Sequence, residues 1–566
     1  MRKREVGKSE MILRGQPSLD PQWAGLTLSG QLQVTAEKYG DRPAVFCEPN
    51  VNLSWSEVRE RSRAIAKGLR ALGVRSGDRV CVWLPNSPEW FLTWLASSYL
   101  GAVTVPVNTR LKTPELAYVL GDASPKILVM MSEFLHNDNV ENLHQSGVLA
   151  SDNKPLVVML EPSEQLDSIS MSEVLAKGHE VSDGELDRVA SEVSIDDPTV
   201  IVYTSGSTGF PKGVVHTHMI LRNECAVTCY LRIEKESIAL GHMPFFHVAG
   251  GFSALLPALI TGSSVVTMTH WDPDLALNLI SKYRVTVFGG IATHYFDLLS
   301  RPQSAVAVAS LRSGWIGGAF NPRDVMIRAK NALGYLPMPS YGMTETTSVT
   351  TFPDLDDSEE MILSGRGKPI SDFEVRVVNP DSGDEMAPEV PGEICVRGHV
   401  VMHSYFGRPD ATNEAIDQGR WFHTGDIGVI GEDGYLSVVG RVKDMYTVGG
   451  NNVYPIEIEK ALADHPAINQ AYVVPVPDER LGDTTFAFVE RKENVDLTAD
   501  GVINFCRDRL TSYKVPRHVR FIDEWPVVVS GKVDKLKLRE IAKEDSANSF
   551  DSATTVDIVS SREARE

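Results

Sequence analysis

The chain contains 566 residues, of which 42% are hydrophobic and 23% are charged, and this composition is typical of a globular protein. The length is too great for a single hydrophobic core and predicts several packed units. The formal net charge of −20 argues against nucleic acid or an anionic membrane as a partner, because either would require clustered lysines and arginines.

The cysteines indicate a reducing compartment, and the apolar stretches argue against a membrane-spanning or secretory segment. Six cysteines are scattered along the chain, unlike a disulfide framework, and Cys225 and Cys229 lack the further cysteines or histidines of a zinc site. No apolar stretch is long enough to span a bilayer, and no apolar core of a secretory signal follows the basic first residues. We therefore expect a cytoplasmic protein with no integral membrane segment.

The first part of the chain predicts an α/β fold. A helical stretch over 56–72 alternates with β-rich runs over 78–84 and 102–107, which is the pattern of helices that cover a largely parallel sheet. The acidic, weakly patterned region from about 135 to 197 is interpreted as a solvated excursion on the surface.

Later segments predict two further parts. Short strands over 374–378 and 392–396, bounded by Gly, Pro and Asp, indicate a β-rich subdomain. Beyond residue 440 the pattern indicates a small α+β unit, with helices and strands expected over 456–463, 498–510, 471–476 and 484–489.

The predicted organisation therefore has four parts. The N-terminal domain, with layered α/β subdomains and the β-rich subdomain, covers 1–440, and a hinge follows at 441–444. A mobile α+β C-terminal domain covers 445–545. The last segment, 546–566, has little to bury and is expected to be a disordered tail.

The run Y-T-S-G-S-T-G-F-P-K-G at 203–213 predicts a loop that holds the phosphates of a nucleotide. Its glycines let backbone N–H groups turn toward an anion, its hydroxyls add donors, and Lys212 adds a mobile positive charge. The apolar run 199–203 predicts a buried strand that feeds the loop. The spacing is not that of a Walker P-loop, and the alternative is a flexible surface turn. The candidate residues are Thr204, Ser205, Gly206, Ser207, Thr208, Gly209 and Lys212.

This run resembles the phosphate loop of the adenylate-forming superfamily, which contains acyl-CoA synthetases, peptide-synthetase adenylation domains and beetle luciferases. The resemblance extends from about residue 26 to 541, and the motifs occur in the family's order. It implies that ATP, Mg²⁺ and coenzyme A are used, and that Lys212 and Thr344 act on the phosphates.

The cluster Tyr341-Gly-Met-Thr-Glu345 combines an aromatic face, a flexible glycine, a hydroxyl and a carboxylate. Tyr341 could stack on adenine, Thr344 could donate to the α-phosphate, and Glu345, with Thr204, could hold Mg²⁺ through oxygen. The alternative is a capped helix start. By resemblance, the adenine-binding segments also include Gly318, Ala319, Gly342 and Met343.

The motif around His-Thr-Gly-Asp426 resembles the family's ribose site. Asp426 could accept hydrogen bonds from both ribose hydroxyls, and Arg441 would hold the ribose from the other side. By itself, Arg441 would be interpreted as a surface arginine. Lys443 lies where the family has its hinge.

The C-terminal unit resembles the family's catalytic and thiol-channel segments. Lys532 matches the catalytic lysine, although the family usually has a basic residue and a threonine where this chain has valines at 527–529. The alternative is an exposed lysine after a turn. Gly449 and Gly450 match the coenzyme A channel, where a β-bulge is the alternative. Asn451 departs from the glutamate that is usual in the family.

The segment Pro-Phe-Phe-His247 resembles that of the acyl and aryl branch of the superfamily, in which the histidine lies between acyl pocket and thiol channel and takes part in catalysis. An apolar acid is favoured, because relatives that activate amino acids usually have an aspartate near this position. A core histidine is the alternative for His247. The expected pocket residues are Ala249, Gly250, Phe252, Gly290 and Gly317.

Together the motifs predict a ligase that joins an apolar fatty, aromatic or cyclic carboxylic acid to coenzyme A. ATP is cleaved to AMP and pyrophosphate, and Lys532 stabilises charge as the acyl-adenylate forms. The alternatives are loading of a carrier-protein phosphopantetheine and a nucleotide-binding regulator without turnover. The sequence leaves the oligomeric state open, a homodimer included.

Overall fold

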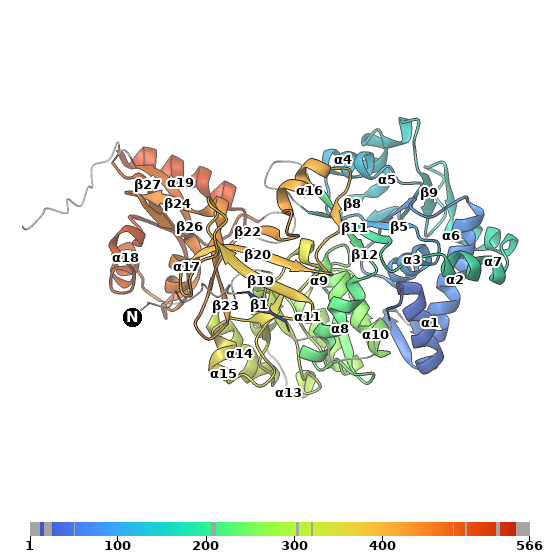
Figure 1. The fold of residues 1–566 in the computed structure, drawn as a ribbon, viewed down its shortest axis with the longest axis horizontal. Coiled ribbons are helices and arrows are strands. Elements are labelled where there is room, and N and C mark those ends of the chain that lie inside the picture. Colours follow the sequence, from blue (N-terminus) through green and yellow to red (C-terminus); the bar gives the residue numbers. More distant parts are fainter. Residues whose placement is uncertain are drawn as a thin grey trace, which may run out of the picture. The chain divides into compact units, whose positions relative to one another are not determined.

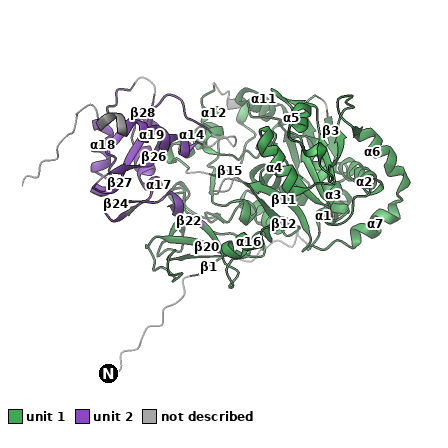
Figure 2. Cartoon of the chain, turned by 90° about the horizontal axis from the view of Figure 1, so that it is seen from above, with its two compact units in different colours: residues 1–424, 428–438 green, residues 425–427, 439–566 purple. Residues whose placement is uncertain are grey.

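The computed structural model describes residues 12–15, 25–49, 51–204, 211–301, 305–318, 321–478, 480–492, 495–527 and 533–550 (Figure 1). The chain divides into two compact units, one of residues 1–424 and 428–438 and one of residues 425–427 and 439–566 (Figure 2). The α/β class is confirmed, with a large N-terminal and a small C-terminal unit. Within the described residues, every helix is too short or too polar to cross a membrane.

An eight-stranded sheet forms the centre of the first unit. The strands from β10 to β11 run parallel. At one edge β12 pairs antiparallel with β11, and β21 pairs antiparallel with β12. In sheet order the strands are β10 (Ser168–Ser170), β9 (Leu156–Met159), β6 (Ile127–Met130), β4 (Arg79–Trp83), β5 (Val103–Pro106), β11 (Pro198–Thr204), β12 (Lys212–Thr217) and β21 (Ser404–Tyr405).

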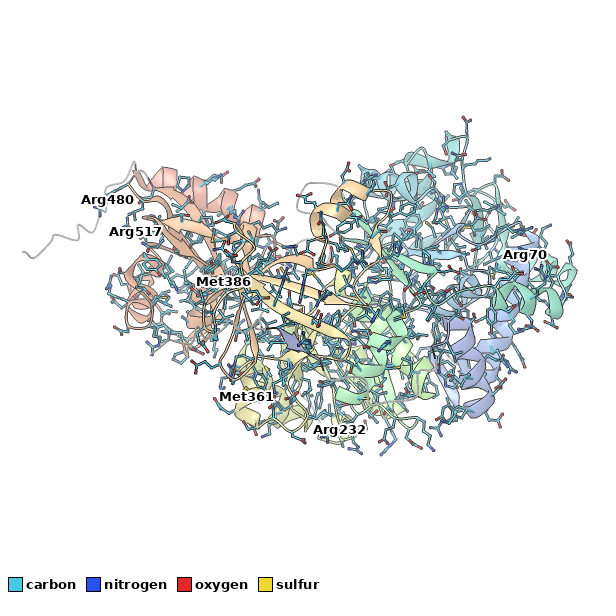
Figure 3. All side chains as sticks on the ribbon, viewed as in Figure 1. Arg70, Arg232, Met361, Met386, Arg480 and Arg517 are labelled. Atoms are coloured by element: carbon cyan, nitrogen blue, oxygen red, sulfur yellow. The ribbon has the colours of Figure 1, made fainter. Side chains whose placement is uncertain are left out.

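Helices cover both faces of this sheet (Figure 1). Successive residues of β4 point to opposite faces, so Val82 joins one apolar layer and Trp83 the other. Arg70, labelled in Figure 3, connects two helices of the first layer, because its Nε donates to Glu185 Oε1 at 3.1 Å. The first layer includes α1 (Leu28–Tyr39), α2 (Trp55–Ala71), α3 (Pro88–Tyr99), α6 (Met171–Lys177) and α7 (Asp183–Ser191), and the second includes α4 (Thr113–Ala123) and α5 (Asn139–Gln145).

The segment 135–197 belongs to the core of this unit, and its interpretation as a surface excursion is wrong. It contributes two strands, β9 and β10, to the central sheet. Val157, Val158 and Met159 of β9 are at most 1% exposed. Four residues are too few to reveal a strand between acidic loops, and the small hairpin β7 (Glu133–Phe134) and β8 (Asn137–Asp138) precedes them.

A second group of strands and helices combines β2 and β3, which precede the phosphate-loop region, with elements that follow it. Its four-stranded sheet has the order β13, β14, β2, β3, and two parallel strands, β15 and β16, lie after it in the chain. The strands are β13 (Ile238–Gly241), β14 (Ser264–Thr267), β2 (Pro43–Cys47), β3 (Val51–Ser54), β15 (Trp315–Gly317) and β16 (Met338–Ser340). The helices are α8 (Ile220–Tyr230), α9 (Val248–Gly250), α10 (Leu256–Thr261), α11 (Pro273–Tyr283), α12 (Ala292–Leu299), α13 (Ala305–Val308) and α14 (Arg323–Leu333).

The predicted β-rich subdomain is confirmed as a five-stranded sheet. Its order is β1 (Leu13–Arg14), β19 (Phe373–Val378), β20 (Gly392–Gly398), β22 (Phe422–Ile430) and β23 (Leu436–Arg441). Nearby in the chain are β17 (Thr351–Phe352), α15 (Glu359–Leu363), β18 (Lys368–Pro369) and α16 (Pro409–Ala415).

The second unit is built on a sheet of its own. β27 lies centrally, between β26 and β24, and also pairs with β28. Helix α19 continues through Phe550, into the segment predicted as a tail, and 551–566 lie outside the described residues. The elements are β24 (Tyr446–Val448), β25 (Asn451–Val453), α17 (Pro455–Ala463), β26 (Ile468–Asp478), β27 (Gly482–Arg491), α18 (Ala499–Arg507), β28 (His518–Phe521) and α19 (Lys535–Phe550).

Gly314→Ala should destabilise the first unit. An added Cβ would lie 1.7 Å from the Phe288 carbonyl oxygen, so the backbone would have to move. We expect a loss of about 1–3 kcal/mol in the free energy of unfolding, measured by denaturant titration. Gly184→Ala in α7, with nothing within 4 Å of the new Cβ, is the control and should be neutral or slightly stabilising. Equal stability of the two variants would contradict the expectation.

Candidate active site

The two ends of the predicted phosphate loop are held together by a β-hairpin. β11 ends at Thr204 and β12 begins at Lys212, and these two residues are paired across the strands. The Thr204 hydroxyl donates to the Lys212 carbonyl at 3.5 Å. The candidates Ser205, Gly206, Ser207, Thr208 and Gly209 lie outside the described residues. The sheet therefore fixes Thr204 and Lys212, the described residues on either side of this segment.

Tyr405 connects the loop lysine with the predicted magnesium carboxylate. The Lys212 Nζ lies 4.9 Å from the centre of the Tyr405 ring. The Tyr405 hydroxyl donates to Glu345 Oε1 at 3.0 Å. Lys212 and Glu345, far apart in sequence, are thus brought to the two ends of one side chain.

The segment after Tyr341 is a tight turn fixed by backbone contacts. Tyr341 exchanges hydrogen bonds with the backbone of Thr350 and Thr351. A Cβ at Gly342 would lie 2.1 Å from the Ser348 carbonyl oxygen, so only glycine fits there. Residues Thr344–Thr346 form a single 3₁₀ turn, in which the Thr346 hydroxyl accepts from the Met343 N–H, so a capped helix start remains an alternative for this segment.

His216 of β12 ties this turn to the central sheet. Its Nε2 lies 2.7 Å from the Thr344 carbonyl oxygen, to which it donates. Burial lowers the pKa of His216 to about 4, so the imidazole is neutral at physiological pH. The sequence prediction missed His216, because its contact joins segments that lie far apart in the chain. Its position places Thr344 and Glu345 beside the strand that starts at Lys212.

A buried carboxyl group lies behind the same turn. Glu224 of α8 is 0% exposed and accepts a hydrogen bond from the Ser348 hydroxyl at 2.5 Å. The Ser348 hydroxyl also lies 3.2 Å from Asn223 Oδ1. Burial raises the pKa of Glu224 to about 8, so this group is largely protonated at neutral pH. The sequence signal for Glu224 was one acidic residue within a largely apolar helix.

The predicted acyl-pocket residues fall into two groups. His247 precedes α9, which contains Ala249 and Gly250. A Cβ at Gly250 would lie 2.1 Å from the Pro244 carbonyl oxygen. Phe252 is buried, with its ring 5.6 Å from that of Trp94 and edge-on to His216 at 5.9 Å.

The second group lies along β15. The Gly317 N–H donates to the Gly290 carbonyl at 3.2 Å, and Ala249 and Tyr341 belong to the same apolar cluster as the neighbouring Trp315. A Cβ at Gly290 would meet ring nitrogens of His242 and His294 within 3.2 Å. Neither histidine was predicted. Gly318 has a φ of +75°, and Ala319 lies outside the described residues.

In the second unit, Asp426 and Arg441 form an ion pair. Arg441 Nε lies 2.9 Å from Asp426 Oδ1, and the Asp426 side chain is only 7% exposed while that of Arg441 is half exposed. Lys443 lies in a short 3₁₀ turn, Val442–Asp444, and Asp444 pairs with Arg539 at 3.3 Å. The two predicted ribose residues are thus in direct contact.

Gly449 and Gly450 form the two-residue loop of the β24–β25 hairpin. Val448 pairs with Asn451, and the two glycines have φ values of +56° and +81°. This turn type needs positive φ at both central residues, which explains the glycines without a β-bulge. The Asn451 amide donates to the Gly449 carbonyl at 3.3 Å, so the residue that departs from the family pattern supports the turn.

Lys532 lies outside the described residues, but the residues on either side of the segment 528–532 are described. Val527 and Val533 form an antiparallel bridge. The Asp534 N–H donates to the Pro526 carbonyl at 2.7 Å. These contacts hold together the described residues on either side of the segment 528–532.

A separate group could in principle hold a metal ion. Glu393, Cys395 and His423 offer ligand atoms within 4.8 Å of one another. The chemistry opposes a metal, because burial raises the pKa of Cys395 to about 12 and the Arg376 guanidinium lies nearby. His423 instead pairs with Glu393 at 2.8 Å.

Comparison with known proteins defines the class. The profile of the AMP-binding enzyme family matches residues 32–406, and that of the AMP-binding enzyme C-terminal domain matches residues 457–532. The 3-[(3aS,4S,7aS)-7a-methyl-1,5-dioxo-octahydro-1H-inden-4-yl]propanoyl:CoA ligase of Rhodococcus jostii is 34% identical, over 91% of this chain and 99% of the relative. The mitochondrial medium-chain acyl-CoA ligase ACSF2 of Macaca fascicularis is 32% identical, over 91% and 87%.

A solved structure agrees. The crystal structure of ATP-bound MatB from Rhodopseudomonas palustris superposes with a TM-score of 0.78 and 28% identity, covering 92% of this chain and all of MatB. The chain belongs to the AMP-binding, adenylate-forming superfamily and, within it, to the acyl- and aryl-CoA ligase branch. Enzymes of this branch are AMP-forming acid–thiol ligases.

Glu224→Gln should change the dependence of stability on pH. The pKa of Glu224 rises from 4.5 to about 8 on folding. Its contribution to the free energy of unfolding of the wild type is therefore fully present below pH 4.5 and is lost as the pH rises toward 8. The amide cannot ionise. We expect the unfolding free energy of the variant, relative to wild type, to rise with pH by up to about 1.4 kcal/mol per unit in this window.

The measurement is denaturant unfolding at a series of pH values. Glu236→Gln, which changes an exposed carboxylate, is the control and should follow wild type. A Glu224→Gln variant whose stability runs parallel to wild type across the whole range would contradict a buried, protonated Glu224.

Proposed function

We propose that the protein is an ATP-dependent ligase that joins an apolar carboxylic acid to coenzyme A in two steps, with release of pyrophosphate and then AMP. The observation that carries this proposal is the chain of contacts Lys212–Tyr405–Glu345 beside the paired ends of the glycine run. Through Tyr405, these contacts bring together a cation and a carboxylate, the two kinds of group that a metal-bound triphosphate needs, at one end of the glycine run. The ATP named for MatB supports the same assignment.

The first step is attack of the substrate carboxylate on the α-phosphorus of ATP, in which the new P–O bond forms and the bond to pyrophosphate breaks. Lys212 and the loop Thr204–Gly209 hold the departing pyrophosphate. Thr344, fixed by His216, donates to the α-phosphate, and Lys532 neutralises charge between the reacting oxygens. Tyr341, Gly318, Ala319, Gly342 and Met343 line the adenine site.

Glu345, with the Thr204 hydroxyl, offers the oxygen ligands that suit Mg²⁺, which would supply charge neutralisation on the phosphates. Asp426 and Arg441 hold the ribose. Since Asp426 is buried and already paired, a ribose bound there shares its carboxylate with Arg441.

In the second step the coenzyme A thiolate attacks the acyl carbonyl carbon, and the C–O bond to AMP breaks. His247 lies at the start of α9, beside the acyl-pocket residues, and borders the thiol route. The Gly449–Gly450 turn offers a backbone surface without Cβ atoms for pantetheine. Rotation of the C-terminal domain about Lys443 exchanges Lys532 for this turn between the steps.

The acid is proposed to be a medium-chain or cyclic carboxylic acid. Phe252, Ala249 and Trp315 provide apolar surface, while Gly250, Gly290 and Gly317 add no side-chain bulk. The names of the two relatives, a medium-chain ligase and a ligase of a bicyclic propanoate, support the same range. Loading of a carrier-protein phosphopantetheine shares the first step and remains the alternative that the assay must separate.

The proposal predicts products that can be measured directly. Purified protein with ATP, Mg²⁺, coenzyme A and a panel of straight-chain, branched, cyclic and aromatic acids should release pyrophosphate and AMP and form an acyl-CoA. A loaded carrier protein replaces coenzyme A in the parallel assay. Formation of ADP and orthophosphate, or acid-dependent pyrophosphate release with transfer only to the carrier, would each reject the ligase proposed here.

Lys532→Ala should separate the two steps. We expect acid-dependent pyrophosphate release to fall by about 10²-fold or more, since one electrostatic group at the transition state is removed. Thioester formation from a supplied acyl-adenylate should be unchanged. Lys537→Ala, which removes an exposed lysine paired with Glu540 in α19, is the matched control. Equal losses in both steps would contradict the role given to Lys532.

A further inference from the structure

We propose that Tyr405 is a positioning residue of the adenylation step, which holds the Lys212 ammonium with its ring face and the Glu345 carboxylate with its hydroxyl. The inference rests on the proposed function, because it concerns the same triphosphate and magnesium site. Its basis is the geometry of one side chain with two different contacts, 4.9 Å from the ring centre to Nζ and 3.0 Å from the hydroxyl to Oε1.

The backbone of Tyr405 is fixed from two sides. β21 pairs with β12, so that Tyr405 lies opposite Val214, two residues after Lys212. The Tyr405 N–H also donates to the Thr412 hydroxyl of α16 at 3.0 Å. The backbone of Tyr405 is therefore fixed relative to the strand that starts at Lys212.

The ring itself is held in an apolar cluster. Tyr405 is 8% exposed and packs with Val214, Met402, Ile416 and Phe422. The hydroxyl extends beyond this cluster and donates to Glu345 Oε1. A packing role alone would need the ring and not the hydroxyl, which distinguishes the two roles experimentally.

The Glu345 end is also fixed through the main chain. The Met402 N–H donates to the Glu345 carbonyl at 2.7 Å, so the short segment 402–405 holds both the backbone and the carboxylate of Glu345. With Oε1 committed to the Tyr405 hydroxyl, the carboxylate has a defined orientation toward a metal. The aromatic face attracts the ammonium without neutralising it, so Lys212 keeps its charge for phosphate.

Two substitutions separate the two contacts. Tyr405→Phe keeps the ring face and removes the hydroxyl, and Tyr405→Leu removes both. We expect Tyr405→Phe to raise the Mg²⁺ concentration for half-maximal acid-dependent pyrophosphate release by about tenfold, since a hydrogen bond to a charged group is lost. Tyr405→Leu should in addition raise the KM for ATP by about threefold or more. Thioester formation from a supplied acyl-adenylate should be unchanged in both variants.

Tyr435 provides a matched control. Its hydroxyl donates to Asp357 at 2.5 Å and its ring lies 4.4 Å from the Lys368 Nζ, so it makes the same two kinds of contact, and neither partner is a predicted site residue. Tyr435→Phe should lower thermal stability about as much as Tyr405→Phe but leave the Mg²⁺ dependence as in wild type. In a Glu345→Gln background, Tyr405→Phe should add no further change in Mg²⁺ dependence.

A second measurement does not depend on turnover. The rise in Tm caused by ATP with Mg²⁺, compared with ATP and EDTA, should shrink in Tyr405→Phe and stay as in wild type in Tyr435→Phe. If no acid releases pyrophosphate with the wild type, the proposed function fails, and this Tm comparison still tests Tyr405. A wild-type Mg²⁺ response of Tyr405→Phe, or equal losses in both half-reactions, would overturn the inference.

Discussion

The pairing of β12 between β11 and β21 is the constraint on which the candidate active site depends. On one side it sets Thr204 opposite Lys212 and so fixes both ends of the glycine run. On the other side it brings Tyr405 next to Val214. Backbone hydrogen bonds within a buried sheet are hard to break, since an unpaired amide there loses its partner without gaining water. The sheet therefore fixes Thr204 and Lys212, the described residues on either side of the predicted phosphate loop.

The same strand organises the rest of the first unit's site. His216 lies four residues after Lys212 and holds the Thr344 carbonyl, and its ring meets Phe252 of the predicted acyl pocket edge-on. Because burial keeps His216 neutral, it acts as a hydrogen-bond donor without adding charge beside the phosphate region. One strand thus contains Lys212 and contacts both the turn at Thr344 and the ring of Phe252, three of the predicted site residues.

Sequence reasoning succeeded where the signal was local. The apolar run 199–203 and the glycines after it predicted a strand and a turn, and β11 confirms the strand. It could not find Tyr405 or His216, because their roles arise from pairing and contacts between segments more than a hundred residues apart. It also misread β9, a four-residue strand with three buried residues between acidic loops, because no periodicity can be read from so short a run.

The sequence predicted Asp426 and Arg441 as ribose-binding residues, but it did not predict the ion pair between them. A carboxylate that is nearly buried loses hydration, and this loss must be offset by a close cation or by donors. Arg441 provides that offset, because its Nε already contacts Asp426 Oδ1. A nucleotide that donates hydrogen bonds to Asp426 must either include the guanidinium in the same network or displace it. Arg441 directly precedes the turn Val442–Asp444, which contains Lys443, so the ion pair with Asp426 lies at the start of that turn.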